Sequence, residues 1–465
     1  MKFTLDEIIQ ATDAKIIKNE GAKGTFTFST DTRTIKPGEI YLPLKGENFN
    51  GEKFIDKALE AGAVGYFYTD AKCKVQSAKC DLILQVKDTL TAYLELANFY
   101  RRKINPKTIA ITGSNGKTTT KEMVYCVLSE KFKTHKSELN FNNEIGVCKT
   151  ILSMPKDTEV LVLEMGMRGL GEIELLSKYA EPDISIISNI GTAHVGRLGS
   201  RENIAKAKCE IVKYMKEGGI LIAHDDELIK KEIEAKSKKQ KAKSEDNTFY
   251  LLPFAFCPTY FSLDNTKIVE SKIGYSKFIY KNHEYELNIE GDYNIQNSLA
   301  AIEAGLSLGM GEGEIAKGLK KYSPIEKRWE IQEIKGYKMI NDSYNANPDS
   351  MVAAIKTIID NYPSALLVLG DMGELGENEV EYHRQIGEFL VKNNKKDINV
   401  ITVGKLANEI TKTLNEKGIF SKNFDDNLQT SRYILDNIKI GTTIVLKASR
   451  IMKLEEIIDE VKTLK

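Results

Sequence analysis

The chain has 465 residues, 42% of them hydrophobic, and its 66 basic side chains balance 66 acidic ones. This length exceeds what one hydrophobic core supports, so we expect about three domains. The balanced charge argues against a nucleic-acid or anionic-membrane partner, and no apolar run reaches the length of a transmembrane segment or a signal core. The six cysteines have no paired spacing, which indicates reduced thiols and predicts a soluble, cytoplasmic protein.

The first predicted domain covers residues 1–84. It mixes short strands with a helix around residues 54–61, and turns are expected at residues 36–38 and 45–46. A basic, polar segment at residues 100–107 then leads into an apolar strand.

A phosphate-binding loop follows that segment. Residues 108–112 form an apolar, β-branched run that predicts a buried strand, and residues 123–128 are apolar at helical spacing. The sequence between them is Thr-Gly-Ser-Asn-Gly-Lys-Thr-Thr, with Ile111 in place of the first glycine of the common pattern. The amides, lysine and hydroxyl of such a loop suit a nucleotide polyphosphate and Mg²⁺. We therefore expect ATP or GTP to bind at Gly113, Ser114, Asn115, Gly116, Lys117, Thr118 and Thr119.

The predicted central domain covers residues 85–325. Apolar strands at residues 160–163, 184–187 and 220–223 alternate with helices, which indicates a mostly parallel sheet. Ligands gather at the carboxyl ends of such strands, where Glu164 and Asn189 stand. The lysine-rich residues 230–243 include glutamates and lack interleaved aromatic side chains, which favours a solvated helix or loop over a nucleic-acid patch.

Three side chains of this domain are candidates for metal chemistry. Glu164 could supply an oxygen ligand to Mg²⁺, although a carboxylate at a strand end could equally cap a helix. A lone histidine such as His194 is more often structural than a ligand. The helix that begins after Ser200 has Lys208 on its apolar stripe, and a buried lysine is costly unless it is paired, deprotonated or able to reach solvent.

The third predicted domain covers residues 326–465. Strands at residues 365–369, 400–403 and 442–446 alternate with helices, one of them at residues 351–362. Gly370, Gly373 and Gly376 are not spaced as in a dinucleotide-binding fingerprint, so NAD binding is not predicted. The predicted fold class is α/β, with a small first domain, a central phosphate-loop domain and a Rossmann-like third domain.

Taken together, the motifs resemble those of the ATP-dependent Mur ligases of peptidoglycan synthesis. The resemblance covers essentially the whole chain, and it implies a UDP-sugar-binding domain, an ATP-binding domain and a C-terminal ligand-binding domain. Residues 345–348 and 370–376 resemble in particular the member that joins D-alanyl-D-alanine to UDP-N-acetylmuramoyl-tripeptide. The resemblance rests on the phosphate loop, Glu164-Met165-Gly166, Thr192-Ala193-His194, Ala207-Lys208, Arg328, and residues 32–46, 142–146, 291–297, 342–348, 370–372 and 447–450.

The resemblance also implies roles for particular side chains. Lys117, Glu164, His194 and Lys208 would form the catalytic set. Two Mg²⁺ ions would be held by Thr118, Glu164, His194 and Lys208, with Lys208 carbamylated by CO₂ so that it offers anionic oxygens. ATP would also contact Asn294, Asn297, Arg328 and Asp342. The two other substrates would contact Thr32, Arg33, Lys45, Gly46, Asn48, Phe54, Asn142, Asn143, Asn345 and Asn347.

The implied reaction activates the tripeptide carboxylate as an acyl phosphate, which the amine of D-alanyl-D-alanine then attacks. The third domain would close about a hinge near residues 323–327, and the enzyme would be a monomer. Two alternatives stay open: a related ligase such as folylpolyglutamate synthetase, and a nucleotide-gated binding protein without turnover. Binding of a UDP substrate by residues 1–84 would separate the first alternative, whereas the four catalytic side chains argue against the second.

Overall fold

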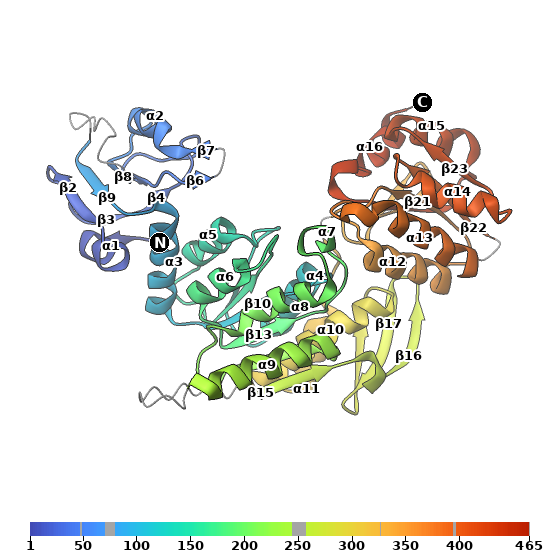
Figure 1. Cartoon of the computed structure of the whole chain (residues 1–465), viewed down its shortest axis with the longest axis horizontal. Helices are drawn as coiled ribbons and strands as arrows, with labels where there is room; N and C mark the ends of the chain where they lie inside the picture. The colour runs from blue at the N-terminus through green and yellow to red at the C-terminus, as the bar shows by residue number, and fades with distance from the viewer. Residues whose placement is uncertain (47–48, 70–79, 244–256, 326, 394–396, 465) are drawn as a thin grey trace.

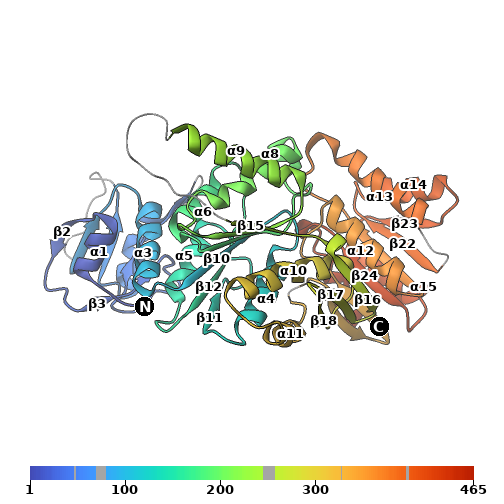
Figure 2. The same ribbon diagram turned by 90° about the horizontal axis from the view of Figure 1, so that it is seen from below.

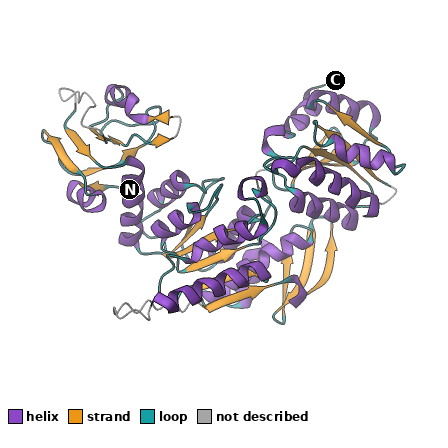
Figure 3. Ribbon diagram, in the orientation of Figure 1, coloured by secondary structure: helices purple, strands orange, loops and turns teal. Residues whose placement is uncertain are grey.

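The computed structural model describes residues 1–46, 49–69, 80–243, 257–325, 327–393 and 397–464. The N-terminal, central and C-terminal parts of the chain follow one another along the long axis, so that the first and last parts lie at opposite ends (Figure 1). Helices and strands occur together in each part, which confirms the α/β class (Figure 3). No helix among the described residues is both long and apolar enough to cross a lipid bilayer.

The N-terminal part contains a mixed sheet with the strand order β2-β9-β8-β5-β4. The buried strand β8 (Gly65–Tyr68) pairs in parallel with β9 (Leu82–Gln85) and β5 (Ile40–Tyr41). Helix α1 (Leu5–Thr12) is an addition to the predicted elements and begins at a capping box formed by Thr4 and Glu7. The other elements are β1 (Phe3–Thr4), β2 (Lys15–Asn19), β3 (Thr25–Phe26), β4 (Phe28–Ser29), β6 (Lys45–Gly46), β7 (Phe49–Asn50) and α2 (Ile55–Glu60).

The central sheet has six strands in the order β11-β12-β10-β13-β14-β15, and every neighbouring pair is parallel, as predicted. Helices cover both faces (Figure 2), so the strands are apolar on both sides. Ile109 and Ile111 of β10 (Lys107–Thr112) pack in one core with α4 (Lys117–Leu128), whereas Ala110 packs in the other. The remaining elements are β11 (Thr134–Lys136), β12 (Val160–Glu164), β13 (Ile184–Ile187), β14 (Ile220–His224), β15 (Cys257–Phe261), α5 (Glu144–Ser153), α6 (Glu172–Ala180), α7 (Val195–Leu198), α8 (Arg201–Lys208), α9 (Glu227–Lys243), α10 (Asp292–Ser307) and α11 (Glu312–Lys320).

Three antiparallel strands form a separate sheet that the pattern of strand and helix did not predict. They are β16 (Thr266–Lys272), β17 (Tyr275–Tyr280) and β18 (His283–Leu287). Along β17, buried residues alternate with half-buried ones, and Phe278 and Tyr280 pack in the same core as α10. An antiparallel sheet with one face on the core has this alternation.

The C-terminal part has a sheet in the order β19-β20-β24-β21-β22-β23, in which only the β19–β20 pair is antiparallel. The predicted strands correspond to β21 (Ala365–Gly370), β22 (Ile398–Val403) and β24 (Thr443–Lys447). Helix α12 (Pro348–Asn361) begins three residues earlier than predicted, because Asn347 caps it and Pro348 suits its first position. The other elements are β19 (Glu330–Ile334), β20 (Tyr337–Asn341), β23 (Ser421–Phe424), α13 (Glu379–Asn393), α14 (Asn408–Glu416), α15 (Asn427–Asn437) and α16 (Glu455–Thr463).

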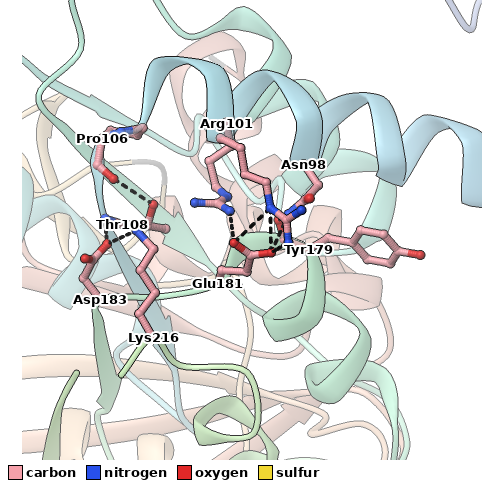
Figure 4. Close-up of polar contacts among 9 residues, drawn as sticks. Asn98, Arg101, Pro106, Thr108, Tyr179, Glu181, Asp183 and Lys216 are labelled. Atoms are coloured by element: carbon pink, nitrogen blue, oxygen red, sulfur yellow. Dashed lines mark hydrogen bonds and ion pairs between the residues drawn. The ribbon is translucent and has the colours of Figure 1, made fainter. Parts of the chain in front are cut away.

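Helix α3 (Thr89–Ile104) connects the N-terminal part to the central part. Its Arg101 is 1% exposed and forms an ion pair with Glu181, which follows α6 (Figure 4). One turn earlier, Asn98 donates a 2.8 Å hydrogen bond from Nδ2 to the backbone carbonyl of Tyr179. The helix is therefore attached to the central part by buried polar contacts.

The connection to the C-terminal part is built around a buried carboxylate. Glu290, which precedes α10, accepts hydrogen bonds from Trp329 Nε1 at 3.0 Å and from the Tyr362 hydroxyl. It also accepts one from the backbone N–H of Gly274 at 2.8 Å. Lys327 and Trp329 both have a positive φ, of 58° and 62°, so the chain turns sharply within this connection.

Candidate active site

The phosphate loop lies between β10 and α4, as predicted. Gly116, with φ of 75°, precedes the first residue of α4, and a Cβ there would lie 2.3 Å from Asn297 Oδ1. The loop is fixed by the segment after β13, since the N–H of Asn115 donates to Asn189 Oδ1 at 2.9 Å. The N–H of Gly191 likewise donates to Ser114 Oγ at 2.9 Å. Glycine is therefore required at position 116, both by its backbone conformation and by the close approach of α10.

The Lys117 side chain folds over this loop. Its Nζ donates a 2.9 Å hydrogen bond to the carbonyl of Gly113. Burial lowers the pKa of the Lys117 ammonium, with a further contribution from Arg328, while the Glu164 carboxylate opposes both. A cation held at this place suits the negative charge of a polyphosphate.

Glu164 is the last residue of β12 and is only 1% exposed. Its Oε2 accepts a 2.8 Å hydrogen bond from the Thr118 hydroxyl, and its Oε1 accepts one of 2.9 Å from Asn142 Nδ2. Lys121 Nζ lies 3.8 Å from Oε2 and is fully buried. The structure thus brings a loop hydroxyl and a predicted metal ligand into direct contact.

Lys208 is the last residue of α8 and is 1% exposed. Within the described part of the chain, no hydrogen bond or ion pair to its ammonium is present. Burial holds the pKa of this ammonium well below its ordinary value, and the charge of Lys117 lowers it further. Burial thus shifts the equilibrium of Lys208 from the ammonium toward the neutral amine.

Only some of the predicted metal ligands suit Mg²⁺ as unmodified side chains. No three His, Cys, Asp or Glu side chains cluster as a metal site in the described ranges. The predicted set contains two side chains of these types, Glu164 and His194, together with the Thr118 hydroxyl. The buried carboxylate and hydroxyl are oxygen donors that Mg²⁺ prefers, whereas Lys208 fits only if it carries an added carboxylate.

The predicted nucleotide residues line one cavity of about 1580 Å³ together with the loop. Asn297 lies against Gly116, and Asn294 donates from Nδ2 to the carbonyl of Glu290 at 2.7 Å. The Arg328 guanidinium stacks 3.9 Å from the ring centroid of Tyr344, and its Nε is buried without a hydrogen-bond partner. The fourth predicted residue, Asp342, pairs with Lys447 Nζ at 2.6 Å.

The predicted substrate residues of the N-terminal part divide into two groups. Lys45 and Gly46 line the same cavity, but Thr32, Arg33 and Phe54 are not among its lining residues. Arg33 is exposed and pairs with Asp31 at 2.6 Å, whereas Phe54 stacks on Phe49, which does line the cavity. Asn48 lies outside the described residues. The substrate roles of these side chains stay predictions.

The remaining predicted residues, Asn142, Asn143, Asn345 and Asn347, line this cavity as well. Asn347 and Asn115 exchange two side-chain hydrogen bonds, of 2.7 and 3.3 Å. The C-terminal part therefore contacts the phosphate loop directly.

Several side chains at the site were not predicted. Lys121 follows Lys117 by one helical turn, which is a signal for a shared face that could have been used. Asp349 accepts hydrogen bonds from the N–H and hydroxyl of Thr192 at 2.6 and 2.7 Å. Glu374 Oε2 lies 2.6 Å from Nδ1 of His194. No sequence pattern links Asp349 or Glu374 to its partner, because each contact joins residues far apart in the chain.

A phosphate-binding loop on a parallel sheet, in a cavity that residues of all three parts of the chain line, defines a nucleotide-binding protein of the phosphate-loop class. The Mur ligase middle domain matches residues 111–305, and the Mur ligase, glutamate ligase domain matches residues 327–450. The chain belongs to the Mur ligase family.

Relatives and solved structures agree with that assignment. The chain is 37% identical to UDP-N-acetylmuramoyl-tripeptide--D-alanyl-D-alanine ligase of Bacillus subtilis (strain 168), over 93% of this chain and 92% of that protein. It is similar to the crystal structure of MurF from Acinetobacter baumannii, with a TM-score of 0.86, 27% identity and 99% of each chain covered. It is also similar to MurF ligase from Thermotoga maritima in complex with ADP, with a TM-score of 0.77 and 26% identity over 94% of this chain and 96% of that one.

Proposed function

We propose that the protein is the ATP-dependent ligase that joins D-alanyl-D-alanine to UDP-N-acetylmuramoyl-tripeptide in peptidoglycan precursor synthesis. The observation that carries this proposal is the 37% identity, over 93% of the chain, to a relative with that name. The cavity is consistent with three ligands, because residues of the N-terminal, central and C-terminal parts line it. The three parts of the proposed enzyme are domains with boundaries after residues 84 and 325.

In the first step, a carboxylate oxygen of the tripeptide attacks the γ-phosphorus of ATP, and the bond to the β-phosphate oxygen breaks. The products are ADP and an acyl phosphate. In the second step, the amine nitrogen of D-alanyl-D-alanine attacks the acyl carbon, the carbon–oxygen bond to phosphate breaks, and the amine gives up a proton. Lys117 and the loop amides would hold the phosphates, so the chain contributes chiefly position and electrostatic stabilisation.

We further propose that Thr118, Glu164, His194 and a carbamylated Lys208 hold two Mg²⁺ ions. Bound Mg²⁺ neutralises phosphate charge during phosphoryl transfer. The neutral amine of Lys208 would add to CO₂ and lose a proton, which gives a carbamate with two anionic oxygens. The burial of Lys208 supports this, because it lowers the pKa of the ammonium and so favours the amine form that reacts with CO₂. An added CO₂ in intact mass measured without acid tests the modification, and an unmodified lysine together with full activity of Lys208→Ala would contradict it.

Three further features belong to this proposal. The C-terminal part closes about residues 323–327, which excludes water from the acyl phosphate. The enzyme acts as a monomer in the cytoplasm. The free cysteines Cys80, Cys126, Cys148 and Cys209 fit a reducing compartment.

The decisive experiment measures phosphate release with MgATP and UDP-N-acetylmuramoyl-tripeptide, with and without D-alanyl-D-alanine, and identifies the product by mass. We expect release to depend on the dipeptide and the product to have the mass of the pentapeptide. Lys117→Ala serves as the inactive control. No dependence on the dipeptide, with tripeptides ending in meso-diaminopimelate and in lysine both tried, would favour a related ligase. No turnover with any acceptor would favour a nucleotide-binding role.

A further inference from the structure

Glu374 belongs to a loop that is firmly attached to the C-terminal part. The loop follows β21, and within it the N–H of Met372 donates to Nε2 of the buried His383 at 2.9 Å. Asp371 Oδ1 accepts a 2.7 Å hydrogen bond from the N–H of Ala407, and the Asp371 carbonyl accepts one of 2.6 Å from the Ser449 hydroxyl. The residues that precede Glu374 are therefore held by the C-terminal part.

This loop meets the segment that carries His194 in the central part. The N–H of Gly196 donates a 3.1 Å hydrogen bond to the Glu374 carbonyl, and a Cβ on Gly196 would lie 2.4 Å from the N of Gly376. His194 and Glu374 both have a positive φ, of 65° and 62°, which is uncommon for residues other than glycine. Backbone strain of this kind is concentrated at functional sites, where the surroundings maintain it.

The two side chains are placed as a histidine and its supporting carboxylate. Glu374 Oε2 lies 2.6 Å from His194 Nδ1, and Arg197 lies 3.6 Å from the other carboxylate oxygen. A histidine that binds a metal through one ring nitrogen usually contacts a carboxylate or carbonyl through the other, which fixes the ring. Nδ1 of His194 is buried and faces this carboxylate at ion-pair distance without a well-aligned hydrogen bond, so Nε2 is the ring nitrogen left for a cation.

We propose that Glu374 is a positioning residue that holds the His194 imidazole for the divalent cation. Because Glu374 comes from the C-terminal part and His194 from the central part, affinity for the cation then depends on docking of the C-terminal part. This inference rests on the proposed function, in which His194 is a metal ligand. The rival interpretation of the same contact is that Glu374 withdraws His194 from the cation.

The two interpretations predict opposite changes in cation binding. The test titrates the full-length protein with Mn²⁺ in the presence of ADP and follows free Mn²⁺ by electron paramagnetic resonance. We expect Glu374→Ala to weaken one class of Mn²⁺ site by about 10- to 100-fold. Glu377→Ala is the matched control, since it removes the same charge from an exposed position three residues away. Equal or tighter binding by Glu374→Ala would overturn the proposal.

A second variant distinguishes positioning from a loss of fold. His194→Ala should lose the same class of site, and the double variant His194→Ala/Glu374→Ala should bind Mn²⁺ no more weakly than His194→Ala alone. If the losses of Mn²⁺ affinity in the two single variants add in the double variant, the proposal is overturned. It is also overturned if Glu374→Ala unfolds at a clearly lower temperature than the wild type, because the weaker Mn²⁺ binding would then come from a loss of fold. Failure of the proposed function would be seen separately, as a wild-type protein without dipeptide-dependent phosphate release.

Discussion

The central part is joined to its two neighbours by contacts of different kinds. At the first junction, Arg101 is buried against Glu181, which also pairs with the more exposed Arg102. At the second junction, Asn115 and Asn347 exchange amide hydrogen bonds, and Asp349 bonds to Thr192, all within or beside the cavity. A buried charge pair is costly to separate, whereas amides and an exposed carboxylate can exchange their partners for water. The comparison indicates that α3, which leads from the N-terminal part, stays fixed to the central part at Arg101, whereas the cavity-side contacts of Asn115 and Thr192 with the C-terminal part can be released.

The largest effect is expected at the first junction. Arg101→Met should lower the free energy of unfolding by about 2 kcal/mol, because it breaks a buried charged hydrogen bond, although Glu181 keeps Arg102 and Asn98 as partners. Arg102→Met is the matched control, since Arg102 is 65% exposed and should cost less than about 1 kcal/mol. Denaturant midpoints followed by circular dichroism would measure both. If the two variants lose the same free energy of unfolding, the expected difference between the buried Arg101 pair and the exposed Arg102 pair is wrong.

At the second junction, Asp349→Ala should shift the docking equilibrium rather than the stability. It removes two hydrogen bonds to Thr192, and in this exposed position we expect a loss of about 1 kcal/mol, or roughly a fivefold lower ratio of docked to undocked molecules. Small-angle scattering would show a more extended average shape. An unchanged scattering curve, or a clear fall in the unfolding midpoint, would contradict a releasable contact.

A smaller effect is expected for the amide pair. In a double-mutant cycle of Asn115→Ala and Asn347→Ala, the coupling energy should be about 0.5–1 kcal/mol, the usual value for neutral hydrogen bonds. The four proteins can be compared by the same scattering measurement. A coupling near zero would mean that the two amides contribute nothing to docking.

The smallest expected effect is the loss of stability that Glu181 causes at low pH. Burial alone would raise the pKa of Glu181, but its bonds with Arg102 and the charge of Arg101 outweigh burial and hold that pKa below the ordinary 4.5. The unfolded chain therefore binds more protons in this range, and the stability from Glu181 is lost as pH falls through and below about 4.5. Thermal unfolding between about pH 6 and pH 4 should show this loss in the wild type and less of it in Glu181→Gln. If the unfolding temperatures of the wild type and Glu181→Gln change with pH in the same way, Glu181 does not cause the loss.

Local patterns predicted the phosphate loop and the parallel strands well. β-Branched runs, glycines and a lysine at fixed spacing determine the corner between β10 and α4, and these signals are contiguous in the chain. The burial of Lys208 also followed from periodicity alone, because its neighbours Ile204 and Ile211 are apolar at helical spacing and are buried.

Contacts between distant segments could not be predicted in this way. The pairs Asp349–Thr192 and Glu374–His194 depend on how two sheets are placed relative to one another, and no local propensity encodes that placement. The antiparallel strands β16 and β17 were missed because their sequences do not alternate strictly between polar and apolar residues, so the period-two signal of a strand is weak there. Helix α1 is different, since its capping box was present in the sequence and could have been recognised.

The carboxylate of Glu290 binds Trp329, and the chain contains one tryptophan. Tryptophan fluorescence of the unlabelled protein therefore comes from a single indole, located where the central and C-terminal parts are connected. Nucleotide and substrate titrations can be followed optically at that one place, with tyrosine emission avoided by excitation at the red edge of the absorption band. The native sequence thus supplies its own reporter of movement between these parts.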